Sequence, residues 1–182
     1  MDFKTLISKR QSVRKYSDVK VSHDVLNRCM EAVRLAPSAS NSQPWKFIIT
    51  DEEPVREKLA RATFSDIIAF NRFAMNAPVI VVIVIDNPKL ITRVAMSVKK
   101  RDWQLIDIGI AAEHFCLQAA EEGLGTCMLG WFDEKKVKEI LNIPDDKTVG
   151  LMISLGYAPD GYPLRAKIRK PLEEITSYNG YY

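Results

Sequence analysis

A basic segment close to the N-terminus is the first part of the chain that could do chemistry. Residues 9–15 read KRQSVRK, with four cations and a hydroxyl. Arg10, Ser12 and Arg14 alternate, so an extended segment would project all three side chains to the same side, as a phosphate clamp requires. A solvated basic surface is the alternative interpretation. The segment alone does not decide between the two.

A stiff polar loop at 36–45 is the second candidate. It reads APSASNSQPW, in which two prolines restrict the backbone. Three serines, an asparagine and a glutamine supply enough donors and acceptors to line a polar ligand. Surface loops are commonly polar for other reasons, so an ordinary loop is the competing interpretation.

The stretch 103–132 contains a third candidate, because it reads as a scaffold that ends in a site. Its first part predicts a helix that is apolar almost all round, which belongs at a domain centre or in a subunit interface. Gly123 and Gly125 can end that helix. A short strand over 126–129 follows, and Gly130 can bring bare backbone close to a ligand. The polar stripe of the helix consists of Asp107, His114, Gln118 and Glu121.

The elements that must position these segments mix helices and strands over one core. Residues 79–85 read VIVVIVI, which predicts a central strand covered on both faces. Further strands are expected from 47 and over 149–155. The expected helices are one capped by Asp2, one capped by Ser22 that stops before Pro37, one that starts at Pro54, a short one over 67–77, and one capped by Asp133 that ends by Pro144. The basic segment 89–102 is interpreted as a weakly helical flap. The class is α+β, or α/β in a looser scheme, with a single domain over 1–182.

Composition excludes several classes of function. The net charge of +3 is too small to indicate nucleic acid, and the odd number of widely spaced cysteines predicts buried free thiols of a reducing compartment. No signal core or membrane-length apolar run occurs, so we expect a cytoplasmic protein without a membrane partner. GxGxxG, GxxxxGK and GxSxG motifs are absent. With only His23 and His114, and no zinc spacing, no metal site is expected, and His114 is interpreted as structural. No catalytic side chains are predicted, so a cofactor must supply the chemistry.

Four separated segments together resemble the FMN-dependent nitroreductase family. They span residues 10–174 and occur in the family's order. The segments are RQSVR at 10–14, PSASNSQPW at 37–45, DIG at 107–109 with GLGTCMLG at 123–130, and GYAP at 156–159 with RKPLEE at 169–174. Three features depart from the family pattern: Gln11 replaces a frequent second arginine, Met128 stands where an aromatic is common, and the region 86–103, which often shapes substrate access, is short.

The resemblance implies an intertwined homodimer with a three-layer α-β-α fold and a mixed, mainly antiparallel sheet. Two FMN molecules would lie in the interface. Separately, the apolar and aromatic residues of the tail 171–182 indicate that it docks on the partner subunit. A backbone N–H near Leu129 and Gly130 would face flavin N5. The cofactor-binding residues carried over are Arg10, Gln11, Ser12 and Arg14 with Lys167 and Arg169 at the phosphate and ribityl chain, Pro37, Ser38, Ser40 and Asn41 along the partner's flavin, and Leu129 and Gly130 at the isoalloxazine.

Several functions remain open at this point. The first is a flavoprotein oxidoreductase that passes hydride from NADH or NADPH to a nitroaromatic, quinone or similar small-molecule acceptor by a ping-pong cycle. A specialised reductase of the same fold (an enone reductase, a deiodinase or a flavin-fragmenting enzyme) and a non-catalytic flavin-binding module are alternatives. A nucleic-acid binder using the clusters 9–15 and 165–170 is disfavoured, because the clusters are short and lack interleaved aromatics. The sequence does not select the acceptor, the nicotinamide, or the role of 86–103.

Overall fold

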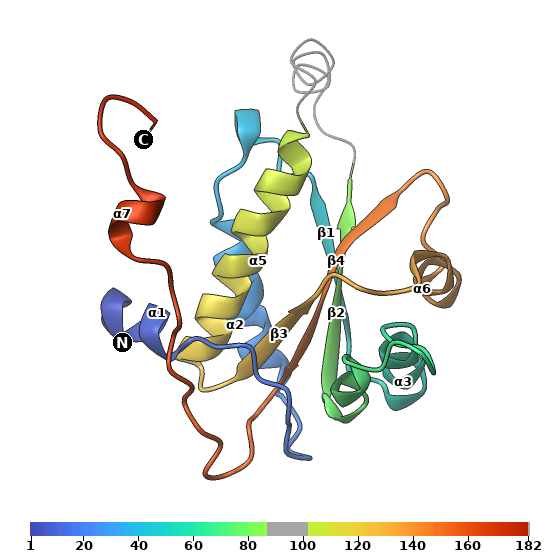
Figure 1. The fold of residues 1–182 in the computed structure, drawn as a ribbon. Helices are drawn as coiled ribbons and strands as arrows, with labels where there is room; N and C mark the ends of the chain where they lie inside the picture. Colours follow the sequence, from blue (N-terminus) through green and yellow to red (C-terminus); the bar gives the residue numbers. More distant parts are fainter. Residues whose placement is uncertain (87–101, 182) are drawn as a thin grey trace.

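The fold is a four-stranded antiparallel sheet between two layers of helices (Figure 1). The structure is a computed structural model that describes residues 1–86 and 102–181. The strand order is β1-β2-β4-β3. The strands are β1 (Trp45–Thr50), β2 (Val79–Ile85), β3 (Gly125–Leu129) and β4 (Thr148–Gly156). The expected α+β class is confirmed. In the described residues, parallel pairing is confined to one bridge between Ser12 and Thr126.

Strand β2 is the centre of the core, as its sequence predicts. It pairs with β1 on one edge and with β4 on the other. Successive side chains of a strand point to opposite faces, and here both faces are covered. Val79, Val81 and Ile83 belong to one buried cluster, whereas Ile80 and Val82 belong to a second cluster on the other face.

The helices divide between the two faces of the sheet (Figure 1). Helices α2 (His23–Arg34) and α5 (Trp103–Glu121) pack against each other and contribute to the first cluster. Helices α3 (Glu53–Arg61) and α6 (Glu134–Leu141) contribute to the second cluster, and the 3-10 helix η2 (Arg72–Asn76) contacts α3. The N-terminal helix α1 (Phe3–Lys9) lies at the side of α5.

The helix caps follow the sequence closely. Asp2, Ser22 and Asp133 each accept a hydrogen bond from a backbone N–H in the first turn of α1, α2 and α6. Such a bond satisfies one of the donors that a helix start leaves free. Helix α6 ends at Leu141, ahead of Pro144 as expected, and Asn142 after it adopts the left-handed conformation with φ 52°.

Two sequence predictions need correction. The helix expected over 67–77 is limited to η2, because Ile67 is 94% exposed and the segment before Arg72 turns instead of packing on the core. Asp107, expected on the polar stripe of the long helix, is only 4% exposed. Leu105 and Ile106 of that helix are exposed although they are apolar, and Glu121 of the predicted stripe is exposed as well. The flap interpretation concerns 89–102, most of which lies outside the described residues.

The C-terminal segment leaves the core after β4. It runs past α1 and carries the short helix α7 (Leu172–Ile175) beyond the helical layer (Figure 1). We call residues 163–181 the arm. Its apolar side chains are exposed in this chain; they are Leu164, Ile168, Leu172, Ile175, Tyr178 and Tyr181.

Candidate functional site

A strongly basic cavity of about 310 Å³ gathers the predicted phosphate residues. Its walls come from two segments, 10–14 and 165–169. Five cations line it, and no acidic side chain among the described residues does so. The predicted residues that the structure brings together here are Arg10, Gln11, Ser12, Arg14, Lys167 and Arg169, and Arg165 joins them.

The first wall is held in place by strand β3. Ser12 forms a parallel bridge with Thr126, and the Val13 N–H donates to the Thr126 carbonyl at 2.9 Å. Val13 is buried, whereas Arg14 is exposed. Gly125 permits this approach, since a Cβ there would lie 2.5 Å from Val13 Cγ2. The glycine in the GLGTC motif is therefore a packing requirement of the cavity wall.

The cations of the cavity are only partly satisfied within the chain. Arg10 forms an ion pair with Glu113 of α5 at 3.1 Å, but its Nε is buried and has no partner among the described residues. The Arg14 guanidinium lies 5.9 Å from the centre of the Phe73 ring. Arg165 donates to the Ser12 carbonyl and Lys167 to the Arg10 carbonyl. Forked donors around a cavity without acids fit a phosphate monoester.

The 37–45 loop is placed away from this cavity. Residues 39–41 form the 3-10 helix η1 (Ala39–Asn41) near the N-terminal end of α5, whereas segment 10–14 passes its other end (Figure 1). The predicted residues Pro37, Ser38, Ser40 and Asn41 are thus not brought to the basic cavity of their own chain. This arrangement is compatible with the expectation that the loop serves a second subunit.

The loop is nevertheless held firmly by its own chain. Ser40, Asn41 and Gln43 adopt left-handed φ angles of 53°, 51° and 48°. The Ala39 N–H donates to Asp107 Oδ1 at 3.0 Å, which anchors the loop on α5. Burial raises the pKa of the Asp107 carboxyl, and the Ala39 hydrogen bond opposes that shift. Its Oδ2 atom is buried without a partner in the described part of the chain.

Leu129 and Gly130 stand at the far end of β3 from Thr126. Leu129 is buried, but Gly130 is exposed, and a Cβ at Gly130 would meet no atom within 4 Å. Next to it, Trp131 and Phe70 are 52% and 64% exposed, with ring centroids 6.4 Å apart. The Asn71 amide donates to the Trp131 carbonyl at 3.2 Å and fixes this turn. Gly130 thus borders open space beside an aromatic pair.

Phe70, Trp131 and Arg165 are the site residues absent from the sequence prediction. Phe70 was assigned to a packed helix, and the pairing with Trp131 joins residues far apart in the chain. Arg165 carried a weak signal, because it belongs to the basic cluster 165–170. Its alternation with Lys167 and Arg169 would have been sufficient to include it.

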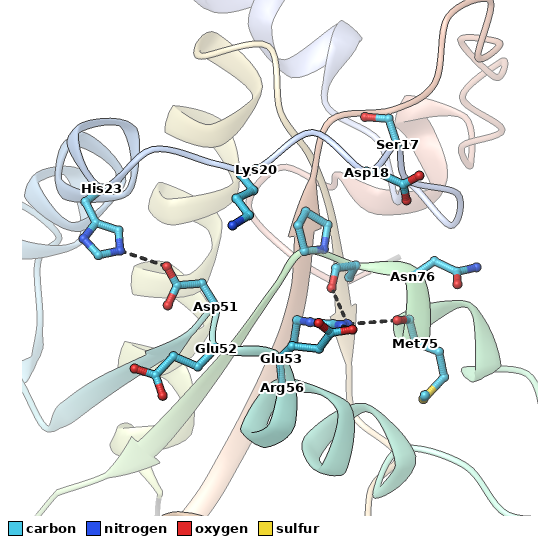
Figure 2. Close-up of a pocket in the computed structure, with 12 residues that line it drawn as sticks. Ser17, Asp18, Lys20, His23, Asp51, Glu52, Glu53, Arg56, Met75 and Asn76 are labelled. Carbon is cyan, nitrogen blue, oxygen red and sulfur yellow. Dashed lines mark hydrogen bonds and ion pairs between the residues drawn. The ribbon is translucent and has the colours of Figure 1, made fainter.

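A larger open cavity of about 700 Å³ lies elsewhere (Figure 2). Three of its polar contacts join lining residues to one another. His23 Nε2 is 2.8 Å from Asp51 Oδ2, and Arg56 donates to the carbonyls of Met75 and Ala77. None of the sequence-predicted residues lines it. We therefore place the candidate site at the basic cavity and at the β3 end with Gly130.

The three cysteines and His114 pack within the fold. Cys29, Cys116 and Cys127 are buried free thiols, as expected, and burial raises the pKa of Cys29 to about 12. His114 Nδ1 lies 3.2 Å from the Ala32 carbonyl, which fits the structural role expected for it. No described helix is long and apolar enough to cross a membrane.

Residues 7–157 match the model of the nitroreductase family. The chain belongs to the nitroreductase family. A family member of known structure from Clostridium novyi NT is 34% identical, with a TM-score of 0.78, and the match covers 88% of this chain and 87% of that one. An FMN-dependent nitroreductase from Clostridium difficile R20291 is 28% identical, with a TM-score of 0.79 and coverage of 97% and 98%. A relative from Archaeoglobus fulgidus with the provisional name NADH dehydrogenase/NAD(P)H nitroreductase is 33% identical over 85% of this chain and 84% of its own.

Family membership confirms three sequence predictions. The resemblance was correct, the fold is that of solved nitroreductase-family structures, and the chain is an NAD(P)H-dependent oxidoreductase. The nitroreductase match extends over most of the chain, so it includes the 10–14, 37–45 and 123–130 motifs.

Proposed function

We propose that the chain is an FMN-dependent oxidoreductase that passes hydride from NADH or NADPH to nitroaromatic, quinone or similar acceptors in a ping-pong cycle. The observation that carries the proposal is the basic cavity, in which five cations gather with no acidic side chain among the described lining residues. Like charges at close range repel, so an anion between them is expected. The phosphate of FMN supplies such an anion.

The residues have distinct tasks in this proposal. Arg10, Ser12 and Arg14 hold the phosphate and ribityl chain from one wall, with Lys167 and Arg169 on the other wall. The backbone at Leu129 and at the exposed Gly130 would border the isoalloxazine, and a backbone N–H there would donate to the flavin. When bound, FMN supplies the hydride-accepting and hydride-donating chemistry. The chain's own groups bind and orient it, and Gly130 leaves one side open for the nicotinamide and then for the acceptor.

The proposed assembly is a homodimer. Segment 10–14 and loop 37–45 lie at different ends of α5, and the family resemblance assigns them to sites shared between two subunits. Exposed apolar side chains of α5 and the arm support a second copy, since large exposed apolar patches mark interaction surfaces. We expect sedimentation to give a yellow dimer. A stable monomer that retains FMN would contradict this.

Truncation after Lys170 tests the role of the arm in the dimer. Leu172, Ile175 and Tyr178 are exposed in the single chain, so the truncated core should fold with nearly unchanged stability. The dimer should instead dissociate at higher protein concentrations than the parent dimer does. A truncated protein that remains an equally tight dimer would show that 171–182 does not dock on the partner.

Anaerobic mixing tests the reaction itself. Protein loaded with FMN should lose its flavin absorbance when NADH or NADPH is added, and nitrofurazone or a quinone should restore it. Double-reciprocal plots should give parallel lines, because the two substrates use one site in turn. Flavin that stays oxidised under both nicotinamides would favour a non-catalytic flavin-binding module. Reduction without reoxidation by these acceptors would favour a specialised reductase.

A further inference from the structure

The arm lies along segment 10–14 and contacts it at alternate positions. The Gln11 amide donates to the Pro163 carbonyl at 3.1 Å, and its Oε1 accepts from the Arg165 N–H at 3.1 Å. The Arg165 guanidinium donates to the Ser12 carbonyl, and the Lys167 ammonium donates to the Arg10 carbonyl. The described walls of the basic cavity are these two segments alone. The cavity therefore exists only while the arm lies on segment 10–14.

The two walls carry charge of the same sign. Arg10 and Arg14 face Arg165, Lys167 and Arg169 across the cavity, and no acidic side chain lines the part that the structure describes. Like charges at close range repel, so an empty cavity favours release of the arm. Hydrogen bonds to the arm oppose this repulsion, and an anion between the walls removes it.

Gln11 is suited to hold the arm in a way that arginine is not. Its amide offers both a donor and an acceptor, and both are used on the arm backbone. An arginine at this position, which is frequent in the family pattern, has no acceptor for the Arg165 N–H and would add a further cation. The departure from the pattern at position 11 thus has a structural consequence.

We propose that Gln11 is a positioning residue that latches the arm onto segment 10–14 and couples anion binding in the cavity to the position of the arm. If an anion in the cavity stabilises the latched position of the arm, the latched arm in turn binds that anion more tightly, because such coupling is reciprocal. The identity of the anion as the FMN phosphate rests on the proposed function. The latch itself requires only an anion with phosphate chemistry.

The consequence extends to the outer part of the arm. Ile168, Leu172, Ile175 and Tyr178 follow the latch and expose apolar surface. Latching fixes where this surface starts relative to the core. Cofactor-loaded protein therefore presents the arm to a second copy in one position, and cofactor-free protein presents it in several.

Trypsin cleavage of the arm measures the latch. Arg165, Lys167 and Arg169 provide cleavage sites, whereas Lys170 precedes Pro171 and resists trypsin. The C-terminal peptides released from the whole protein are followed by mass spectrometry without anion, with saturating FMN, and with inorganic pyrophosphate. In the parent protein, we expect either anion to slow arm cleavage about tenfold, the order that one or two hydrogen bonds supply.

Three substitutions of Gln11 separate the contributions of its donor and its acceptor to the latch. Gln11→Arg keeps donors without an acceptor, Gln11→Met has neither, and Gln11→Glu keeps the acceptor and adds a negative charge. With FMN bound at saturation, the Arg and Met variants should lose most of the protection. Gln11→Glu should protect the arm even without an anion. Gln118→Arg, which makes the same charge change on α5 outside the cavity, should behave like the parent.

The outcomes separate the latch from the proposed function. Equal protection of the parent and Gln11→Arg by bound FMN would overturn the latch, because protection would then be simple coverage of the cleavage sites. So would a Gln11→Glu arm that is cleaved as fast as the parent arm without anion. If FMN does not bind but pyrophosphate gives the expected pattern, the latch stands and the FMN proposal fails.

Discussion

Strand β2 and segment 10–14 are both held by β pairing, but the pairing of β2 is complete and that of segment 10–14 is not. Strand β2 is paired along both edges and buried on both faces. Segment 10–14 has one parallel bridge, a row of cations and a buried Arg10 Nε without a partner among the described residues. The contacts within a single chain are sufficient to pair and bury the sheet core. The basic segment instead carries charge that the described part of the chain leaves largely uncompensated, which the proposed function assigns to an anionic ligand.

A substitution in the sheet core should have the largest effect, and that effect is on stability. Phe115 is fully buried and packs against Phe47, with ring centroids 6.1 Å apart. Phe115→Ala should lower the free energy of unfolding by about 3–5 kcal/mol, because it removes contacts and leaves a cavity. Urea unfolding measures this. A loss below about 1 kcal/mol would show that the core is less tightly packed than the contacts indicate.

A substitution of a cation in the basic cavity should lower ligand affinity instead. Arg14→Ala should weaken FMN binding by about 2 kcal/mol, the cost of losing a charge-assisted hydrogen bond, with little change in unfolding. Arg10→Ala and Arg169→Ala should act similarly, and riboflavin affinity should change much less. Fluorescence titration measures both ligands. Arg61→Ala removes an exposed cation paired with Glu57 and serves as the control. Equal losses for FMN and riboflavin would show that these cations do not hold phosphate.

A pair of glycines sharpens the comparison within one motif. Gly125→Ala should cost about 1–3 kcal/mol of stability, because its Cβ overlaps the Val13 side chain. Gly130→Ala should change stability by less than about 0.5 kcal/mol, since its Cβ enters open space. It should instead slow reduction of bound FMN by NAD(P)H, measured by stopped flow. Reduction at the parent rate would move the proposed redox centre away from Gly130.

The smallest effect is expected from Asp107, which belongs to the core but anchors a site loop. Burial raises its folded-state pKa above the unfolded value of about 3.9. Its contribution to stability is therefore present at low pH and is lost as the pH rises through the folded pKa. The stability of Asp107→Asn relative to the parent should thus increase as the pH rises from about 4 through the folded pKa of Asp107. Thermal unfolding at several pH values measures this, and a pH-independent difference would contradict it.

Local signals account for the parts of the fold that were predicted well. The caps at Asp2, Ser22 and Asp133 depend on neighbours within one helical turn, and β2 is recognisable from its unbroken run of valine and isoleucine. The approach of segment 10–14 to the tail came from the family resemblance. The burial of Asp107 could not be read from spacing, because it depends on the 37–45 loop folding over α5. The use of Gln11 depends on the backbone of Pro163 and Arg165, which are distant in sequence.

The sheet order also has a consequence for synthesis of the chain. One edge of β2 is covered by β1, which precedes it, but the other edge waits for β4, which follows α5, β3 and α6. Until β4 emerges, an uncharged, proline-free stretch of seven β-branched residues has an open edge, the kind of segment that pairs with other chains. The nascent chain is thus most exposed to aggregation after its central strand has formed. Substitutions that weaken β4 should therefore reduce the yield of soluble protein more than they reduce ligand affinity at the candidate site.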